Sequence, residues 1–146
     1  HLPHGLQGFF DLKEAEAYAE KVRKPIFIAF TGHGCVNCRE MEARVWSAPE
    51  VLSILHNDYV VVALYTDDKK QLPREDWITT DTGKALKSLG KINSYYALHR
   101  YGINAQPYYV LQGHSGKLLA EPRGYNLDVA EFVAFLQRGL EEYDKQ

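Results

Sequence analysis

The segment Gly34-Cys35-Val36-Asn37-Cys38-Arg39 places two cysteines between an apolar run, Ile26 to Phe30, and a helix-forming run. The apolar run predicts a buried strand. Cys35 then falls at a helix N-terminus, where free backbone N–H groups and the helix dipole favour a thiolate. Cys38 returns to the same side of the first turn, within reach for a disulfide. We therefore expect Cys35 to be the nucleophile of a dithiol switch and Cys38 its resolving partner.

Other roles for the two cysteines remain open at this point. Cysteines are often core residues, although core cysteines rarely take this spacing at a strand-to-helix junction. A zinc site needs four ligands, and the chain has no second Cys-x-x-Cys pair. A copper or zinc site made by Cys35, Cys38 and His33 is the remaining metal alternative. A purely structural disulfide is disfavoured, because closing so short a loop removes little entropy from the unfolded chain.

The composition is that of one soluble domain, with 146 residues, 45% of them hydrophobic and 25% charged. The 17 basic and 19 acidic side chains give a formal net charge of -2, which provides neither a nucleic-acid footprint nor a polybasic membrane patch. No run approaches a membrane span, and the chain begins at His1 without a signal segment, as in a mature secreted form or a domain of a larger protein. We expect a single domain over residues 1–146, with residues 1–10 as an N-terminal extension.

Hydrophobic patterns in the first half predict alternating helices and strands. A first helix should begin after its N-cap, Asp11, and another should begin at Pro49, after the cysteine helix. Residues 26–30 and 59–65 are apolar throughout, which indicates strands buried on both faces. The strand-helix-strand order makes them parallel neighbours.

The second half begins with a polar stretch from about residue 67 to 82 that contains Trp77, which we interpret as an inserted surface segment. Helical signal follows at 83–89 and at 94–101, with Gly90 as the expected interruption.

The end of the chain predicts an antiparallel hairpin and a closing helix. The hairpin arms are residues 107–112 and 117–121, and the helix runs from Asp128 to about Tyr143. The complete order is βαβ, α, β-hairpin, α. It predicts an α/β protein with a central mixed sheet flanked by helices and an insertion before the third main helix.

This order resembles the thioredoxin superfamily, and three motifs carry the resemblance. Cys35-Val36-Asn37-Cys38 stands at the active-site position, the segment from His99 to Pro107 resembles the approach to the family's cis-proline, and Arg123-Gly124-Tyr125 resembles its glycine region. The residues from Cys35 to Glu42 and the later Ser47-Ala48-Pro49 are most similar to the C-terminal domains of the DsbD thiol-disulfide interchange proteins. The likeness covers nearly everything except the insertion and implies a thioredoxin-like fold.

The resemblance also implies roles for residues beside the cysteines. Pro107 corresponds to the cis-proline, and the backbone of Gln106 would pair with an incoming peptide. Glu42 follows Cys38 by four residues and Cys35 by seven, so it shares their helix face and can raise the thiol pKa values or exchange a proton. An ordinary strand-starting proline and a solvated glutamate are the alternative interpretations.

Two positions, Ala29 and Gly34, depart from the family pattern, and His33 is a candidate to replace the missing groups. Ala29 stands where thioredoxins usually bury an aspartate that shuttles protons to the second cysteine. Gly34 replaces the tryptophan that commonly precedes the first cysteine, which predicts a barer and more flexible rim for substrate binding. His33 is a candidate acid-base group or partner contact, with plain solvent exposure as the alternative.

These features predict a thiol-disulfide oxidoreductase, mainly a protein-disulfide reductase, whose redox centre is the Cys35–Cys38 pair and which needs no organic cofactor. The resemblance implies a periplasmic location, a membrane-embedded donor domain, and thioredoxin-like or immunoglobulin-like acceptor domains. The acidic Glu40 and Glu42 argue against a strongly stabilised thiolate and hence against a strong oxidant. A free-standing general thioredoxin, the Cys/Cys/His metal-handling module and a binding module that only keeps the fold are the alternatives.

Overall fold

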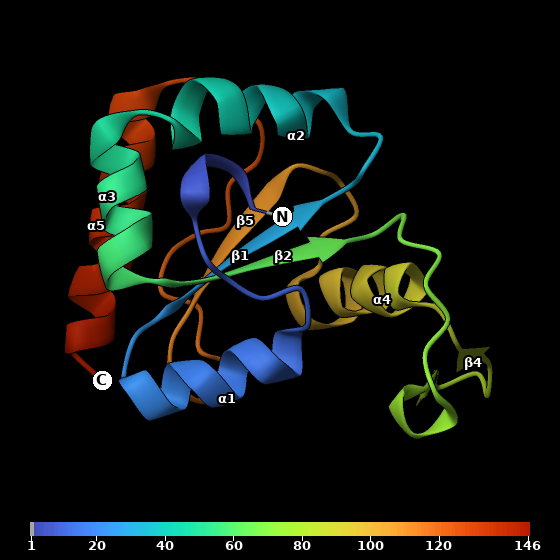
Figure 1. Ribbon diagram of the computed structural model, residues 1–146. Coiled ribbons are helices and arrows are strands. Elements are labelled where there is room, and N and C mark those ends of the chain that lie inside the picture. The colour runs from blue at the N-terminus through green and yellow to red at the C-terminus, as the bar shows by residue number, and fades with distance from the viewer. Residues whose placement is uncertain (1) are drawn as a thin grey trace.

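The computed structural model describes residues 2–146, which fold around a three-stranded mixed sheet (Figure 1). Its strands are β1 (Ile26–Thr31), β2 (Val60–Tyr65) and β5 (Tyr108–Gln112), in the order β2-β1-β5. β1 runs parallel to β2 and antiparallel to β5. The two apolar runs therefore form the parallel pair that the sequence predicted.

Helices cover both faces of the sheet (Figure 1). One face carries α2 (Val36–Met41), α3 (Pro49–Asp58) and α5 (Val129–Asp144), and the other carries α1 (Leu12–Val22) and α4 (Leu89–Tyr101). Alternate residues of β1 point to opposite faces, so the whole strand is buried. Within residues 2–146, no helix is long and apolar enough to cross a membrane.

The core on the face of α2, α3 and α5 is built around Phe27. Its ring stacks on Tyr109 with 5.3 Å between centroids and meets Trp46 at 5.5 Å and Phe132 at 6.0 Å in edge contacts. None of these four side chains is more than 2% exposed. Aromatic pairs of this kind add about 0.5–1.5 kcal/mol each to the hydrophobic gain. The cluster therefore fixes how α5 and the segment after α2 pack against β1.

Local capping explains where several helices begin and end. The Asp11 carboxylate accepts a hydrogen bond from the Glu14 N–H at the start of α1, and Asp128 accepts one from Glu131 at the start of α5, both at 2.9 Å. Gly102 ends α4 with a φ of 68°, a left-handed conformation that glycine adopts without strain.

The start of α4 differs from the sequence-based expectation. Residues 83–88 are not helical, and α4 begins at Leu89 and runs through Gly90. The Gly90 N–H donates to the Asp68 carbonyl at 2.8 Å, and a Cβ at Gly90 would lie 2.6 Å from that oxygen. Gly90 is therefore not a helix interruption. It is needed because the backbone of the insertion passes directly against the helix.

The predicted C-terminal hairpin is only partly formed. β5 is its first arm, but residues 117–121 form no regular strand and pair with β5 through one isolated bridge, Gln112 to Leu118. Pairing resumes between Tyr109 and Arg123, in a register that is shifted by two residues. The ladder is interrupted around Pro122, which has no N–H to donate.

The insertion and the residues just after it form a small substructure beside the sheet, with an antiparallel pair of short strands, β3 (Ile78–Thr79) and β4 (Ala85–Leu86) (Figure 1). Trp77 organises it, because the indole N–H donates to the Leu72 carbonyl at 2.8 Å. The cationic groups of Arg74 and Lys87 lie 5.3 Å and 4.8 Å from the centre of a Trp77 ring. Trp77 is half-buried and acts as the internal scaffold of the insertion.

Candidate active site around Cys35 and Cys38

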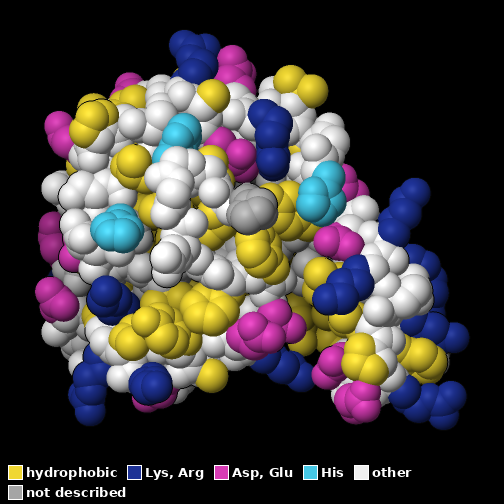
Figure 2. Space-filling view, viewed as in Figure 1, with side chains coloured by type: hydrophobic (Ala, Val, Ile, Leu, Met, Phe, Trp, Pro, Cys, Tyr) yellow, Lys and Arg dark blue, Asp and Glu magenta, His cyan; other side chains and the backbone are white. Residues whose placement is uncertain are grey.

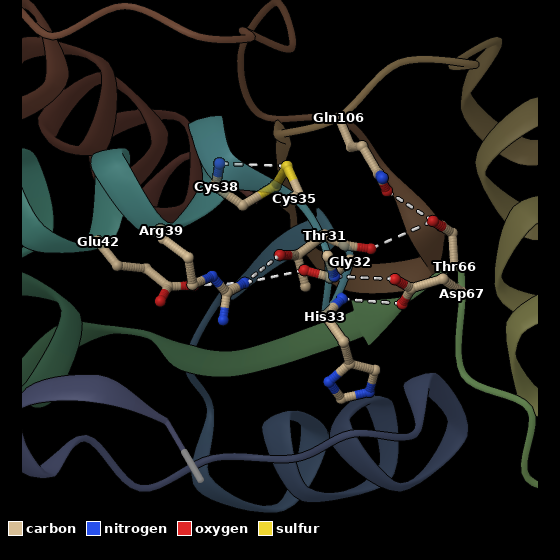
Figure 3. The surroundings of a disulfide bond; sticks show 11 residues. Thr31, Gly32, His33, Cys35, Cys38, Arg39, Glu42, Thr66, Asp67 and Gln106 are labelled. Carbon is tan, nitrogen blue, oxygen red and sulfur yellow. Dashed lines mark hydrogen bonds and ion pairs between the residues drawn. A yellow bond between two sulfur atoms is a disulfide. The ribbon is translucent and has the colours of Figure 1, made fainter.

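The two cysteines lie at the junction of β1 and α2, as their spacing predicted. Cys35 is the N-cap of α2, Cys38 lies in its first turn, and a disulfide joins them (Figure 3). The Cys38 N–H donates to the Cys35 sulfur at 3.1 Å. Cys35 is partly exposed, whereas Cys38 is only 2% exposed. One sulfur is therefore open to a partner, and the other is protected behind it.

The position of Cys35 favours an anionic sulfur when the pair is reduced. A thiolate there accepts the N–H of Cys38 and faces the positive end of the helix dipole. The helical stretch behind it is extended, because α2 continues into a π-helical turn, Glu42–Trp46. The geometry thus supports Cys35 as the nucleophile.

The loop before Cys35 is held by Asp67, which the sequence analysis did not single out. The Asp67 carboxylate accepts hydrogen bonds from the backbone N–H groups of His33 at 2.8 Å and Gly34 at 3.1 Å (Figure 3). Burial is the largest single effect and acts to raise the pKa of Asp67, but these two N–H donors, the nearby His33 and the Asp67 backbone N–H together hold the pKa below its usual range. A carboxylate just after β2 thereby fixes the turn that leads to Cys35.

Replacing Asp67 by Ala should release this turn. We expect the free energy of unfolding to fall by about 1 kcal/mol at pH 7, because two N–H donors lose an exposed, solvent-screened acceptor. Folding lowers the pKa of Asp67, so its contribution is full above the unfolded value of about 3.9 and is lost as the pH falls through the folded value. Urea unfolding of the wild type and the Asp67→Ala variant at pH 7 and pH 3 measures this. A stability difference that grows toward pH 3 would contradict the assignment.

The loop before β5 lies close to the same end of β1. The Gln106–Pro107 peptide bond is cis, as the resemblance implied, and Pro107 is buried while Gln106 is exposed. Gln106 accepts a hydrogen bond from the Thr66 hydroxyl with 2.5 Å between the oxygens, and that hydroxyl also lies 3.2 Å from the Thr31 carbonyl (Figure 3). The end of β2 therefore ties the cis-proline loop and the cysteine loop together.

This arrangement of sheet, cysteine pair and cis-proline loop agrees with comparisons to known proteins. The model of the thioredoxin-like domain family matches residues 12–140. The chain belongs to the thioredoxin-like domain family. No curated protein sequence matches this thioredoxin-like domain.

Solved structures of thioredoxin-like proteins share the fold. A DsbH oxidoreductase is 20% identical with a TM-score of 0.68, covering 95% of this chain and 89% of that chain. A thioredoxin from Thermus thermophilus is 19% identical with a TM-score of 0.66, covering 93% and 88%. The reduced DsbD C-terminal domain of Neisseria meningitidis is 19% identical with a TM-score of 0.61, covering 90% and 98%. At these identities the likeness shows the fold alone.

In this thioredoxin-like domain, Glu42 is held by Arg39. The Glu42 side chain is 13% exposed, and its carboxylate lies 3.2 Å from the Arg39 guanidinium (Figure 3). Arg39 also donates to the Thr31 hydroxyl at 2.9 Å and to the Gly32 carbonyl at 3.1 Å. Burial raises the pKa of Glu42 above its usual range, although Arg39 acts to lower it. Glu42 is thus a largely buried carboxyl that follows the cysteines on their helix.

His33 is turned away from the cysteines (Figure 3). Its ring stacks on Tyr65 with 4.0 Å between centroids, and its Nε2 lies 3.4 Å from an Asp68 carboxylate oxygen. Nowhere in residues 2–146 do three or more His, Cys, Asp or Glu side chains gather in a way that could hold a metal ion. The described residues therefore do not form the Cys/Cys/His site that was left open as an alternative.

Ala29 occupies the centre of β1, where thioredoxins usually bury an aspartate. It is 1% exposed and lies beside Ala63 and Tyr109 on the neighbouring strands. Burial raises the pKa of Tyr109, so its hydroxyl stays protonated at neutral pH. These neighbours provide no carboxyl group in place of the aspartate.

Proposed function

We propose that this domain is a thiol-disulfide oxidoreductase that acts mainly as a protein-disulfide reductase. The observation that carries the proposal is the partly exposed Cys35 sulfur, bonded to the buried Cys38 at the start of α2. Reduction of this bond produces one accessible nucleophile and one resolving thiol. The membership of the thioredoxin-like family supports the same chemistry.

The exchange takes place in two steps. The Cys35 thiolate attacks one sulfur of a partner disulfide, which forms a mixed disulfide and releases the other partner sulfur as a thiolate. Cys38 then loses its proton and attacks the Cys35 sulfur, which forms the Cys35–Cys38 bond and releases the second partner sulfur. Two electrons pass to the partner, whose two thiolates take up protons from the solvent, and a donor dithiol has to reduce the pair again. As in the family that the chain resembles, the backbone of Gln106 would pair with the partner segment beside Cys35.

Glu42 is the proposed proton acceptor for Cys38 in the second step. Burial raises its pKa, which makes its carboxylate a better proton acceptor than an ordinary glutamate. It shares the helix of both cysteines, and Ala29 cannot supply the carboxyl group at the position usual in thioredoxins.

A Glu42→Gln variant tests this role. Loss of the negative charge should move the pH midpoint for alkylation of the reduced cysteines to lower pH, and resolution of a mixed disulfide should slow. Because folding raises the pKa of Glu42, its ionisation destabilises the protein as pH rises from the unfolded value of about 4.3 through the folded value. The variant should therefore match the wild type near pH 4 and exceed its stability at pH 7. Alkylation rates against pH, with Glu50→Gln as the control, measure the first effect, and an unchanged midpoint would exclude Glu42.

The reduction potential of the pair tests the direction of transfer. Equilibration in redox buffers of dithiothreitol or glutathione, followed by alkylation of the free thiols, determines it. A reductant should have a potential near that of thioredoxins, about -270 mV, whereas a strong oxidant lies near about -120 mV. A value close to the second figure would overturn the reductase proposal.

The cellular setting that we propose is the periplasm, with electrons supplied by a membrane-embedded donor domain. The support is the likeness of the segment from Cys35 to Glu42 to DsbD C-terminal domains and the shared fold. A Cys38→Ser variant that traps partners as mixed disulfides should capture a membrane protein and periplasmic acceptors. Capture of many cytosolic proteins instead would favour the alternative, a free-standing general thioredoxin.

A further inference from the structure

A groove of about 700 Å³ lies between the loop after β2 and the start of α4. Residues of the segments 66–71 and 85–91 line it. Its volume is that of a ligand site rather than of a single bound ion. The groove adjoins the active site, because Thr66 and Asp67 line it and also hold the Gln106 side chain and the loop before Cys35.

Exposed cations line this groove. They are Lys69, Lys87 and Lys91, and with Ser88 they define what we call the lysine groove. Lys87 is held in place by the Trp77 ring, 4.8 Å away. No carboxylate within residues 2–146 forms an ion pair with any of the three. Figure 2 shows several Lys and Arg side chains over the insertion, with Asp and Glu side chains between them.

The two carboxylates that line the lysine groove make hydrogen bonds within the protein. Asp67 accepts the backbone N–H groups of His33 and Gly34. Asp68 accepts the backbone N–H of Lys70 at 2.9 Å, and its other oxygen lies 3.4 Å from the His33 ring. The lining of the groove therefore carries three lysines against two carboxylates, and neither carboxylate forms an ion pair with a lysine in the described part of the chain, so its net charge is positive and favours an anionic ligand.

Ser88 adds an unused hydrogen-bonding group to the positive charge. It is the N-cap of α4 and is only 8% exposed, yet its hydroxyl makes no hydrogen bond to any of residues 2–146. The first turn of this 13-residue helix contains no acidic residue to offset the dipole. A hydroxyl at a helix N-terminus that lines the same groove as three lysines is suited to a carboxylate oxygen.

We propose that the lysine groove binds a carboxylate-rich segment of the polypeptide whose disulfide reacts at Cys35. This inference rests on the proposed function, because it names the partner class of that site. The volume of the groove and its continuity with the Cys35 loop favour a polypeptide over a free anion. The acidic segment occupies the groove while the partner's sulfur reaches Cys35.

Equilibrium binding of a cysteine-free peptide tests the docking without any redox step. A fluorescein-labelled acidic peptide, measured by anisotropy, should bind the wild type about tenfold more tightly than a Lys69→Glu/Lys91→Glu variant. A Lys13→Glu/Lys117→Glu variant makes the same change in net charge away from the groove and should bind within twofold of the wild type. Ser88→Ala, which changes no charge, should weaken binding several-fold. In about 1 M salt, where the Debye length is about 3 Å, the preference should vanish.

A second assay links the lysine groove to the chemistry. The reduced wild type should reduce a peptide disulfide with an acidic flank about tenfold faster than the same peptide with Gln replacing Glu. The Lys69→Glu/Lys91→Glu variant should lose this preference and still reduce the neutral hydroxyethyl disulfide at the wild-type rate.

The two assays separate failure of the docking from failure of the function. If the wild type binds the acidic peptide but reduces neither disulfide, the lysine groove is a binding site as proposed, but the proposed reductase function is wrong. If the Lys69→Glu/Lys91→Glu and Lys13→Glu/Lys117→Glu variants bind the acidic peptide equally weakly, the docking proposal is wrong. The docking proposal is also wrong if inorganic phosphate, or a single-stranded oligonucleotide of equal charge, binds as tightly as the peptide.

Discussion

Replacement of Cys35 by Ser is expected to lower the rate of disulfide reduction by more than about a thousandfold. A serine hydroxyl is not ionised at neutral pH and cannot form the mixed disulfide. The Cys38→Ser variant keeps the nucleophile but cannot resolve the intermediate, so a covalent adduct through Cys35 should accumulate. Initial rates with a disulfide-bonded peptide, together with mass spectrometry under non-reducing conditions, measure both effects.

The two cysteine variants should remain folded, which circular dichroism checks. The disulfide closes a very short loop, and its contribution to stability through the unfolded chain is small. A wild-type rate for Cys35→Ser, or an adduct that forms through Cys38, would refute the assignment of the nucleophile.

Replacement of Phe27 by Ala is expected to be the most destabilising change in the core, at about 3–5 kcal/mol. The Phe27 ring is fully buried and packs against Tyr109, Trp46 and Phe132 in the core on one face of the sheet. Its removal leaves a cavity that these rigid rings cannot close. Denaturant unfolding of the variant measures the loss.

Phe27→Leu is the matched control for the cavity. It keeps most of the apolar volume and should cost much less, about 1–2 kcal/mol. If Phe27→Ala lost no more stability than Phe27→Leu, the aromatic cluster would not be the centre of the core.

The sheet and the cysteine helix were predictable because their signals are local. Two apolar runs of β-branched and aromatic residues mark β1 and β2, and each is buried along its whole length. Asp11 and Pro49 mark helix starts at the positions that the structure shows. Hydrophobic pattern and capping chemistry act over a few residues, so one sequence is enough to locate these elements.

The predictions that were wrong concern segments whose conformation depends on contacts between distant residues. The pattern at 83–89 favoured a helix, but the pairing of β4 with β3 and the packing of Gly90 against Asp68 decide that region. The second hairpin arm has the expected composition, yet the register shift near Pro122 breaks its ladder. Intrinsic preference was overridden by tertiary contacts in both cases.

In the candidate site, too, local features were predictable and contacts between distant residues were not. The cysteine pair and Pro107 follow from motif and position, whereas the orientation of His33 is set by stacking on Tyr65. Asp67 acts on His33 and Gly34 across a gap of more than thirty residues, which no local pattern reveals. One signal was present: parallel strands end at the same edge of a sheet, so the acidic residue two positions after β2 belongs beside the loop after β1.

Counting thiols through a single exchange tests most directly the claim that Cys35 and Cys38 transfer electrons to a partner disulfide. The reduced protein should show two titratable thiols before mixing with excess disulfide-bonded peptide and none afterwards, while two thiols appear on the peptide for each protein molecule. If both protein thiols persisted, or disappeared without an equal gain on the peptide, the account would be contradicted.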